Sequence, residues 1–154
     1  MISKLKFDED LLFLVHDTAQ LMRRHVDRRA RLHGMTRAQW AVLARLDRQP
    51  GLSQNELAHL IDVEPISIGR LVDRLEEGGF VQRSPDPADR RVWRLSLTDK
   101  ATPILAEVAA FRAELNRTMS ENIEPETLAT VTRGLRDIRA NLSKDKARAR
   151  KVAT

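Results

Sequence analysis

The chain has 154 residues, of which 42% are hydrophobic, 32% charged and 4% aromatic, and its formal net charge is +5. It contains no cysteine, which excludes disulfides, Cys-based zinc sites and thiol redox chemistry. This length supports one sizeable core, the scarcity of aromatic residues predicts a mainly helical protein, and the positive charge favours an anionic partner such as nucleic acid.

The N-terminal region lacks the charge pattern of a signal peptide and the length of a membrane span. The apolar run from Leu11 to Val15 is too short to cross a bilayer, and Asp8, Glu9 and Asp10 precede it where a signal peptide is basic. We therefore expect a soluble cytoplasmic protein that makes no contact with membranes.

Two helices are expected in the first third of the chain. Apolar residues recur at helical spacing from Leu11 to Ala30, and Gly34 stands just past the end of this pattern, where a helix C-terminus favours glycine. Thr36 and Gln39 have the spacing of a capping box, which predicts the start of a second helix.

A helix-turn-helix is expected next. Ser53 and Glu56 have the spacing of a second capping box, and Pro65 suits the first turn of the following helix. Four apolar residues of this following helix share one face, which we expect to be buried: Ile68, Leu71, Val72 and Leu75. Two short helices joined by a few residues form the motif.

A β-hairpin follows the helix-turn-helix. Residues 80–84 and 92–97 are short β-type runs on either side of a Pro-rich turn. Apolar and polar residues alternate in the second run, as a half-buried strand requires. The hairpin would form a wing beside the helix-turn-helix, with Asp89-Arg90-Arg91 at its tip.

Two long helices are expected in the last third. One begins near Thr98 or Thr102, and the other begins after Pro125. The last helix carries apolar residues at alternating spacings of three and four, which is a coiled-coil-like seam that needs a partner: Leu128, Val131, Leu135, Ile138 and Leu142.

The partner of this seam is either in the same chain or in a second copy. Ile2, Leu5, Phe7 and the helix from residue 104 are the candidate surfaces, and we favour a two-fold homodimer. Residues 143–154 are rich in Lys and Arg after the last apolar position, and we expect them to form a frayed basic end.

The order of these elements resembles the MarR family of bacterial transcriptional regulators. The resemblance rests on the motifs "MTRAQWAVLARL", "GLSQNELAHLIDV" and "IGRLVDRLEEGGFVQR", and above all on "DPADRRVWRLSLTDKA". It implies a single MarR-type domain over 1–154, mainly α with a small β-hairpin wing. Within that domain it implies a winged helix-turn-helix at about 36–98, dimerisation helices at about 1–33 and 100–142, and a basic tail at 143–154.

The resemblance also implies which residues contact DNA. It places the recognition helix at 64–77, with Ser67 and Arg70 at the family's hydroxyl and arginine positions. Gly69 departs from the family pattern, which removes one expected polar contact and costs about 1 kcal/mol of helix stability relative to Ala. The complete expected set is Thr36, Arg37, Ser53, Gln54, Pro65, Ser67, Arg70, Arg74, Asp89, Arg90, Arg91 and Arg94.

The wing tip has a specific expected role. One arginine enters the narrow minor groove, where negative potential is concentrated, while Asp89 holds the neighbouring guanidinium. The sequence leaves open whether Arg90 or Arg91 inserts. In the alternative interpretation Asp89 and one arginine only stabilise the hairpin, and Ser67 and Arg70 form an ordinary solvated helix face.

We expect no catalytic site, no cofactor and no metal site. The histidines at 16, 25, 33 and 59 lack the close pairing of a zinc site, and no Gly-rich phosphate loop or nucleophile elbow is present. A pocket for a small aromatic or anionic effector is expected from His16, Met22, Arg23 and Trp40, although a tryptophan in this position more often belongs to the core.

The sequence therefore predicts a DNA-binding transcriptional regulator. We expect a repressor that binds double-stranded palindromic operators as a homodimer and that a small-molecule effector releases. The alternative is a winged-helix dimer that acts as a protein-interaction scaffold without specific DNA binding. This alternative arises because acidic residues outnumber arginines between residues 53 and 98.

Overall fold

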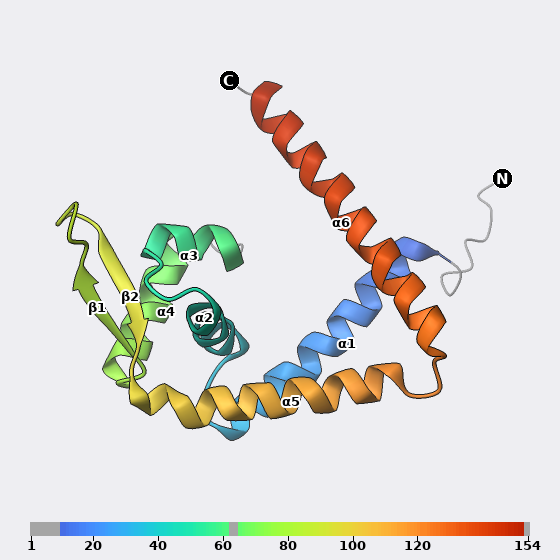
Figure 1. The fold of residues 1–154 in the computed structure, drawn as a ribbon, viewed down its shortest axis with the longest axis horizontal. Helices are drawn as coiled ribbons and strands as arrows, with labels where there is room; N and C mark the ends of the chain where they lie inside the picture. Colours follow the sequence, from blue (N-terminus) through green and yellow to red (C-terminus); the bar gives the residue numbers. More distant parts are fainter. Residues whose placement is uncertain (1–9, 62–64, 153–154) are drawn as a thin grey trace. The chain divides into compact units, whose positions relative to one another are not determined.

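The computed structural model describes residues 10–61 and 65–152, and it forms two compact units, Met1–Phe111 and Arg112–Thr154. The fold is mainly helical with one two-stranded hairpin, which confirms the predicted fold class (Figure 1). The expected functional division near residue 100 stays a prediction. The elements are α1 (Leu11–Leu32), α2 (Arg37–Arg48), α3 (Gln54–Ile61), α4 (Pro65–Glu77), β1 (Val81–Pro85), β2 (Trp93–Leu97), η2 (Asp99–Ala101), α5 (Thr102–Ser120) and α6 (Pro125–Val152).

Local capping signals set the helix starts in the first unit. The Asp10 carboxylate accepts hydrogen bonds from two backbone amides at the start of α1, and Gly34 follows the helix with a φ of 67°. Both predicted capping boxes are present, Thr36 with Gln39 and Ser53 with Glu56. These bonds satisfy amides that a helix N-terminus otherwise leaves unpaired.

The core of the first unit surrounds the buried face of α4. Ile68, Val72 and Leu75 are inaccessible to solvent, and α4 contacts α2, α3 and β1. Figure 1 shows α3 and α4 lying beside the wing strands. Three neighbouring elements therefore fix the orientation of α4, and its opposite face remains open to solvent.

The wing is an antiparallel hairpin in which Val81 pairs with Leu97 and Pro85 with Trp93. Leu95 is fully buried, but Trp93 is 50% exposed because it lies at the outer end of the hairpin, opposite Pro85. The backbone before α3 adds to the sheet, since the Leu95 amide donates to the Leu52 carbonyl at 2.9 Å. The wing is thus joined to the helix-turn-helix through its inner half.

The connection from the wing to α5 differs in detail from a simple capped helix. The Thr98 hydroxyl donates to the Gly79 carbonyl at 2.5 Å instead of capping a helix. The short 3-10 helix η2 follows, and α5 starts at Thr102. Of the two expected starts, the structure selects Thr102.

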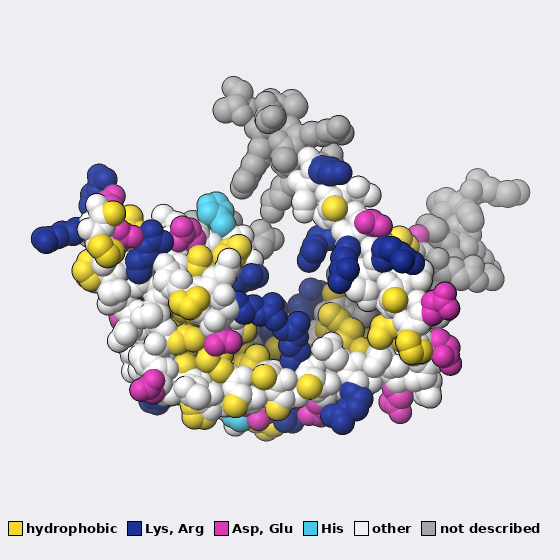
Figure 2. Space-filling model, viewed as in Figure 1, with side chains coloured by type: hydrophobic (Ala, Val, Ile, Leu, Met, Phe, Trp, Pro, Cys, Tyr) yellow, Lys and Arg dark blue, Asp and Glu magenta, His cyan; other side chains and the backbone are white. Residues whose placement is uncertain are grey.

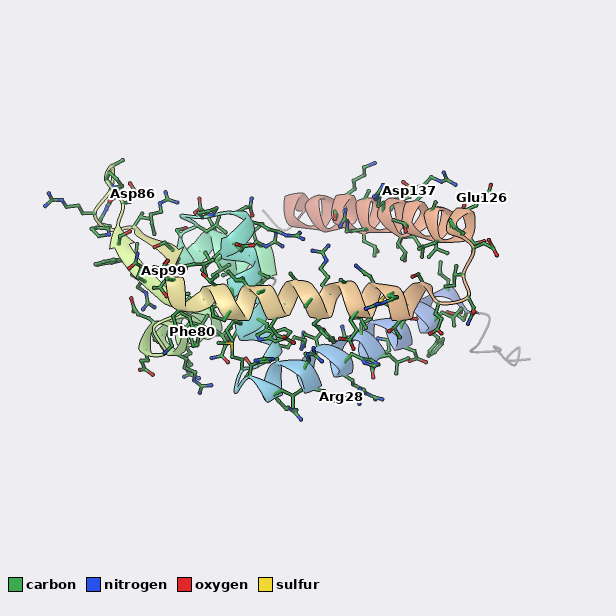
Figure 3. All side chains as sticks on the ribbon, turned by 60° about the horizontal axis from the view of Figure 1, so that its bottom comes forward. Arg28, Phe80, Asp86, Asp99, Glu126 and Asp137 are labelled. Atoms are coloured by element: carbon green, nitrogen blue, oxygen red, sulfur yellow. The ribbon has the colours of Figure 1, made fainter. Side chains whose placement is uncertain are left out.

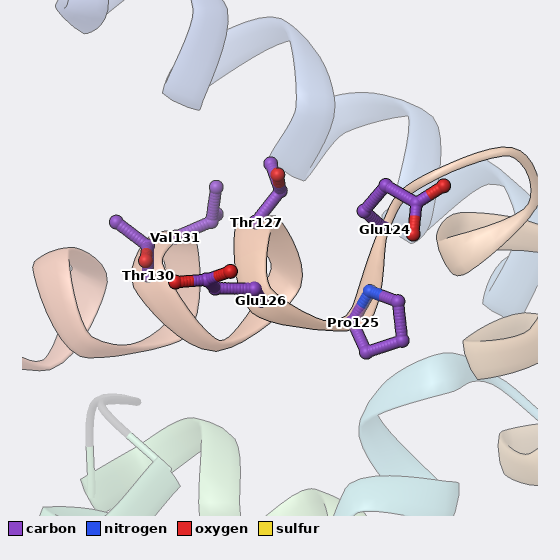
Figure 4. A pocket seen from close by; sticks show the side chains of 6 residues that line it. All are labelled: Glu124, Pro125, Glu126, Thr127, Thr130 and Val131. Carbon is purple, nitrogen blue, oxygen red and sulfur yellow. The ribbon is translucent and has the colours of Figure 1, made fainter.

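The second unit contains the end of α5 and the long helix α6. The expected seam is present on α6, where Leu128 is 37% and Leu142 67% exposed within the single chain. Ile2, Leu5 and Phe7, the other expected seam residues, lie outside the described residues. A depression of about 700 Å³ opens at the start of α6 (Figure 4), and every residue that lines it is exposed.

The prediction that the chain frays from residue 143 onward is wrong for the backbone, because α6 continues to Val152. The sequence after Gly134 contains no glycine or proline and is rich in Ala, Lys and Arg, which are strong helix formers. No described helix combines the length and the apolar composition that a membrane span requires.

Candidate nucleic-acid interface

The solvent face of α4 carries the side chains expected to contact bases. Ser67, Arg70 and Arg74 are exposed, whereas Ile68 and Val72 on the opposite face are buried. Neither Arg70 nor Arg74 makes a side-chain hydrogen bond or ion pair with another described residue. Pro65 begins α4, and its side chain lies outside the described residues. The helix therefore presents hydroxyl and guanidinium donors along its first three turns.

The wing tip is a turn closed by hydrogen bonds to the carboxylates of Asp86 and Asp89. The Asp86 carboxylate accepts from the Ala88 amide at 2.7 Å and from the Asp89 amide at 3.1 Å. The Arg91 guanidinium donates through Nε and Nη2 to the two carboxylate oxygens of Asp89, both at 3.0 Å. These bonds lower the pKa of Asp89 and keep the pair charged. Arg90 is exposed and has no such bond among the described residues.

Basic side chains project from this tip into solvent. Figure 2 shows Lys and Arg side chains at the end of the wing, and the Arg91 side chain is 90% exposed. Figure 3 places Asp86 toward the tip and Phe80 and Asp99 at the base of the hairpin. The positively charged side chains of the tip thus lie at the opposite end of the hairpin from its base, where the wing joins α4.

Arg94 is held by a group of protein acceptors that we call the Arg94 cluster. Its Nε donates to Asp86 Oδ2 at 2.6 Å, and its Nη1 donates to Glu56 Oε2 at 2.8 Å and to the Gly51 carbonyl at 3.3 Å. The hydrogen bond from Arg94 lowers the pKa of Asp86, and capping bonds from Ser53, followed by Arg94, lower the pKa of Glu56. Nε and Nη1 of Arg94 thus already donate to protein acceptors, and its predicted DNA contact stays a prediction.

Sequence reasoning missed a second group, the Arg83 cluster, which joins β1 to α4. Arg83 Nη2 donates to Asp73 Oδ1 at 2.6 Å, its Nη1 donates to Glu76, and its side chain is only 19% exposed. Nη2 also lies 3.3 Å from Gln54 Oε1. Gly69 leaves room for this amide, because a Cβ there would lie 3.3 Å from Gln54 Nε2. The cluster fixes the wing strand against the expected recognition helix.

The remaining expected DNA contacts lie at helix starts. Thr36 and Ser53 are the capping residues of α2 and α3, and helix N-termini of this kind also suit phosphate contacts. Arg37 Nε donates to Asp27 Oδ1 of α1 at 3.2 Å, so this pair links the first two helices. None of these side chains lies in the Arg94 cluster.

Comparison with known proteins identifies the arrangement. Residues 35–93 match the MarR family. The transcriptional regulator SlyA superposes with a TM-score of 0.80 at 24% identity, over 88% of this chain and 96% of its own. Apo wild-type MarR from E. coli gives 0.73 at 25% identity over 84% and 96%, and the transcriptional regulator PA3341 gives 0.77 at 33% identity over 85% and 96%. This chain belongs to the MarR family of transcriptional regulators.

In this MarR-family chain the expected effector residues do not gather around Trp40. The Trp40 ring lies 5.9 Å from the His33 ring and 6.0 Å from the Phe111 ring. His16 instead forms a 2.6 Å hydrogen bond with Gln20, and it lies about 25 Å along α1 from His33 at 1.5 Å of rise per residue. Met22 is half-buried and Arg23 is exposed. The four residues therefore do not form one pocket within a single chain.

The Trp40 side chain nevertheless has a buried polar group that lacks a partner among the described residues. Trp40 is 2% exposed, and its Nε1–H has no hydrogen-bond partner within the described residues. Nearby, Arg29 Nε donates to Glu107 Oε1 at 2.6 Å and its guanidinium lies 5.6 Å from the centre of the Phe111 ring. A buried donor without a partner costs free energy, so this indole is the strongest candidate contact for a bound molecule.

Proposed function

We propose that this MarR-family protein is a transcriptional repressor that binds palindromic double-stranded DNA as a homodimer and leaves it when a small-molecule effector binds. In this proposal it acts on the chromosome in the cytoplasm and catalyses no reaction. The observation that carries the proposal is the separation between arginines that hold the fold and arginines that face solvent.

This separation explains how a segment that is not basic overall can bind DNA. The carboxylates that outnumber its arginines are largely engaged in structural ion pairs, with Arg83, Arg94 and Arg91 as the cations. Arg70, Arg74 and Arg90 keep their guanidinium groups open to solvent on the α4 face and at the wing tip, and the Arg91 side chain stays 90% exposed there although it pairs with Asp89. Exposed positive side chains are thus concentrated where a duplex would contact the winged helix-turn-helix, which favours DNA binding over the scaffold alternative. The acidic partners in these pairs are Glu56, Asp73, Glu76, Asp86 and Asp89.

We infer that Arg91 is the arginine that enters the minor groove. Asp89 occupies its Nε and one hydrogen of Nη2, so the outer edge of the guanidinium stays available to a base while its position is fixed. A side chain that is fixed before binding loses less conformational entropy on binding. Arg90, without such a partner, suits a phosphate contact.

The apolar seam of α6 supports the dimer. Leu135 and its neighbours on α6 remain exposed in the single chain, and a second copy related by two-fold symmetry would cover them. Each lobe then places one α4 helix in the major groove. The two half-sites are expected about 10 base pairs apart on one face of the duplex.

The effector is proposed to be a small aromatic or anionic compound that contacts the Trp40 indole. Trp40 and Trp93 are the two tryptophans of the chain, so a Trp93→Phe variant reports on Trp40 alone. Benzoate is the probe, and we expect it to change the fluorescence of this variant until the signal reaches a plateau as the benzoate concentration rises. A fluorescence signal that does not respond would exclude this contact.

The proposed function is tested by gel shift and footprinting on the DNA upstream of the protein's own coding sequence. Wild-type protein is expected to protect two symmetric half-sites, and the double variant Arg70→Ala/Arg91→Ala to lose this protection. Arg117→Ala removes an exposed positive charge outside the winged lobe and serves as the control. If all variants bind the DNA equally weakly and protect no half-site in the footprint, the scaffold alternative would be favoured.

A further inference from the structure

The first turn of α4 exposes an aliphatic side chain to which the fold gives no packing role. Ile66 is 71% exposed, whereas Ile68, Val72 and Leu75 of the same helix are inaccessible to solvent. A β-branched residue on a solvent face contributes no burial and has weaker helix propensity than Ala, Leu or Lys. Stability therefore does not account for an isoleucine at this position.

Ile66 lies on the side of the helix that carries the polar side chains. Arg70 is one helical turn further along and exposed, and Ser67 is the adjacent exposed residue. Among the described residues of α4, Ile66 is the large apolar side chain that is exposed on this face. The face thus combines hydroxyl and guanidinium donors with one apolar contact surface.

The major groove contains an apolar group that matches such a surface. Thymine presents its C5-methyl group there, and aliphatic side chains contact it, while arginine binds the O6 and N7 of guanine. The N-terminal residues of a recognition helix are those that reach the base edges. Building on the proposed function, we infer that Ile66 contacts the C5-methyl of one thymine in each half-site and thereby helps to determine the operator sequence.

The helix geometry limits where this thymine lies. Ile66 and Arg70 are about 6 Å apart along the helix axis, at 1.5 Å of rise per residue. Base pairs are spaced 3.4 Å apart along the duplex, so the thymine is expected within about two base pairs of the guanine that Arg70 contacts.

The inference is tested by replacing thymines with deoxyuridine, which removes only the methyl group. Each thymine of the footprinted operator is replaced in turn, symmetrically in both half-sites, and the affinity of wild type, Ile66→Ala and Leu60→Ala is measured. Leu60 is the control, because it is a 41% exposed aliphatic residue on the neighbouring helix α3. Thermal melts of the variants check that they fold, which the exposure of both residues leads us to expect.

One replaced thymine is expected to weaken wild-type binding by about fourfold per half-site, which corresponds to the burial of one methyl group. The same replacement changes the affinity of Ile66→Ala less than twofold, and Leu60→Ala keeps the wild-type sensitivity. Wild-type protein that binds the operator tightly but is indifferent to every replacement would overturn this inference alone, as would full sensitivity in Ile66→Ala. Failure of wild-type protein to bind any duplex specifically would overturn the proposed function as well.

Discussion

Helices α4 and α6 carry apolar residues at similar spacings of three and four, but the part of the chain that the structure describes buries only the α4 face. In α4 the stripe is inaccessible to solvent and packs against α2, α3 and β1. In α6 the seam residues Leu128, Val131, Leu135 and Leu142 are exposed in the single chain. The spacing of apolar residues therefore indicates that a face needs a partner, but it does not indicate whether the partner belongs to the same chain.

The difference separates two kinds of free energy. The α4 face contributes to the folding of one chain, so its loss lowers stability at any protein concentration. In the proposed dimer the α6 face contributes to association, so its loss would show up as a change with protein concentration. Four predictions use this difference and the arginine clusters, in order of decreasing expected effect.

Leu75→Ala is expected to lower the free energy of unfolding by about 2–5 kcal/mol, because it leaves a cavity at a fully buried position. Chemical denaturation at two protein concentrations measures this loss, which should be the same at both once dimer dissociation is taken into account. A loss below about 1 kcal/mol would show that the α4 face is not part of a packed core.

Leu135→Asp is expected to raise the dimer dissociation constant by about 10- to 100-fold, since it places a charge in an apolar seam. Sedimentation velocity across a concentration series measures the shift. Ala140→Asp, an exposed position on the side of the same helix opposite the seam, is the matched control and should leave the dimer intact. Equal behaviour of the two variants would contradict the seam.

Arg94→Gln is expected to lower the affinity for every duplex by less than about tenfold without changing the preferred sequence, because the pairs it breaks are partly exposed to solvent and serve to position the wing. Fluorescence anisotropy on core-varied duplexes measures this. Arg94→Lys keeps the charge but not the forked geometry, so it should restore binding only in part. A change in base preference would instead make Arg94 a base contact.

Acid is expected to loosen the wing only below about pH 4. The pKa values of Asp86 and Glu56 are lowered in the folded protein, so their contribution is present above the ordinary carboxyl pKa and is lost as the pH falls through the lowered values. The Nε–H signal of Arg94 in NMR spectra should stay protected from pH 7 to 5 and weaken below 4, while that of Arg90 is unprotected throughout. Loosening between pH 7 and 5 would point to a histidine instead.

The parts of the fold that depend on neighbouring residues were predictable from sequence. The two capping boxes join residues three apart, and the buried face of α4 follows from its periodicity. The Arg94 cluster was not predictable, because it joins Arg94 to Glu56, which is 38 residues away and meets it only when the wing packs on α3. The same holds for the expected effector pocket. Only the fold shows that His16 lies far along α1 from the surroundings of Trp40.

The exposure of the candidate interface was predictable to the level of the element but not of the individual arginine, and its contacts with DNA stay a prediction. The sequence placed exposed donors on the recognition helix and at the wing tip. It did not distinguish Arg90 from Arg91, because the choice depends on which guanidinium Asp89 binds. It also gave Arg94 the same role as Arg70, since ion pairs with distant carboxylates leave no local signal.

The central claim is that α4 and the wing contact different grooves of one duplex. It is tested most directly by measuring DNA binding of wild type, Arg70→Ala, Arg90→Ala and Arg91→Ala across a salt series. The duplexes differ either in the half-site bases that α4 would contact, called the core, or in the bases on either side of them, called the flanks. Arg91→Ala should remove the preference for A·T-rich flanks, and Arg90→Ala should weaken all duplexes equally, each lowering the log-affinity against log-salt slope by roughly one unit per lobe. Arg70→Ala should change the preferred core base. Unchanged affinity in both wing variants would contradict the account, because the wing would then be only a hairpin and the scaffold alternative would gain support.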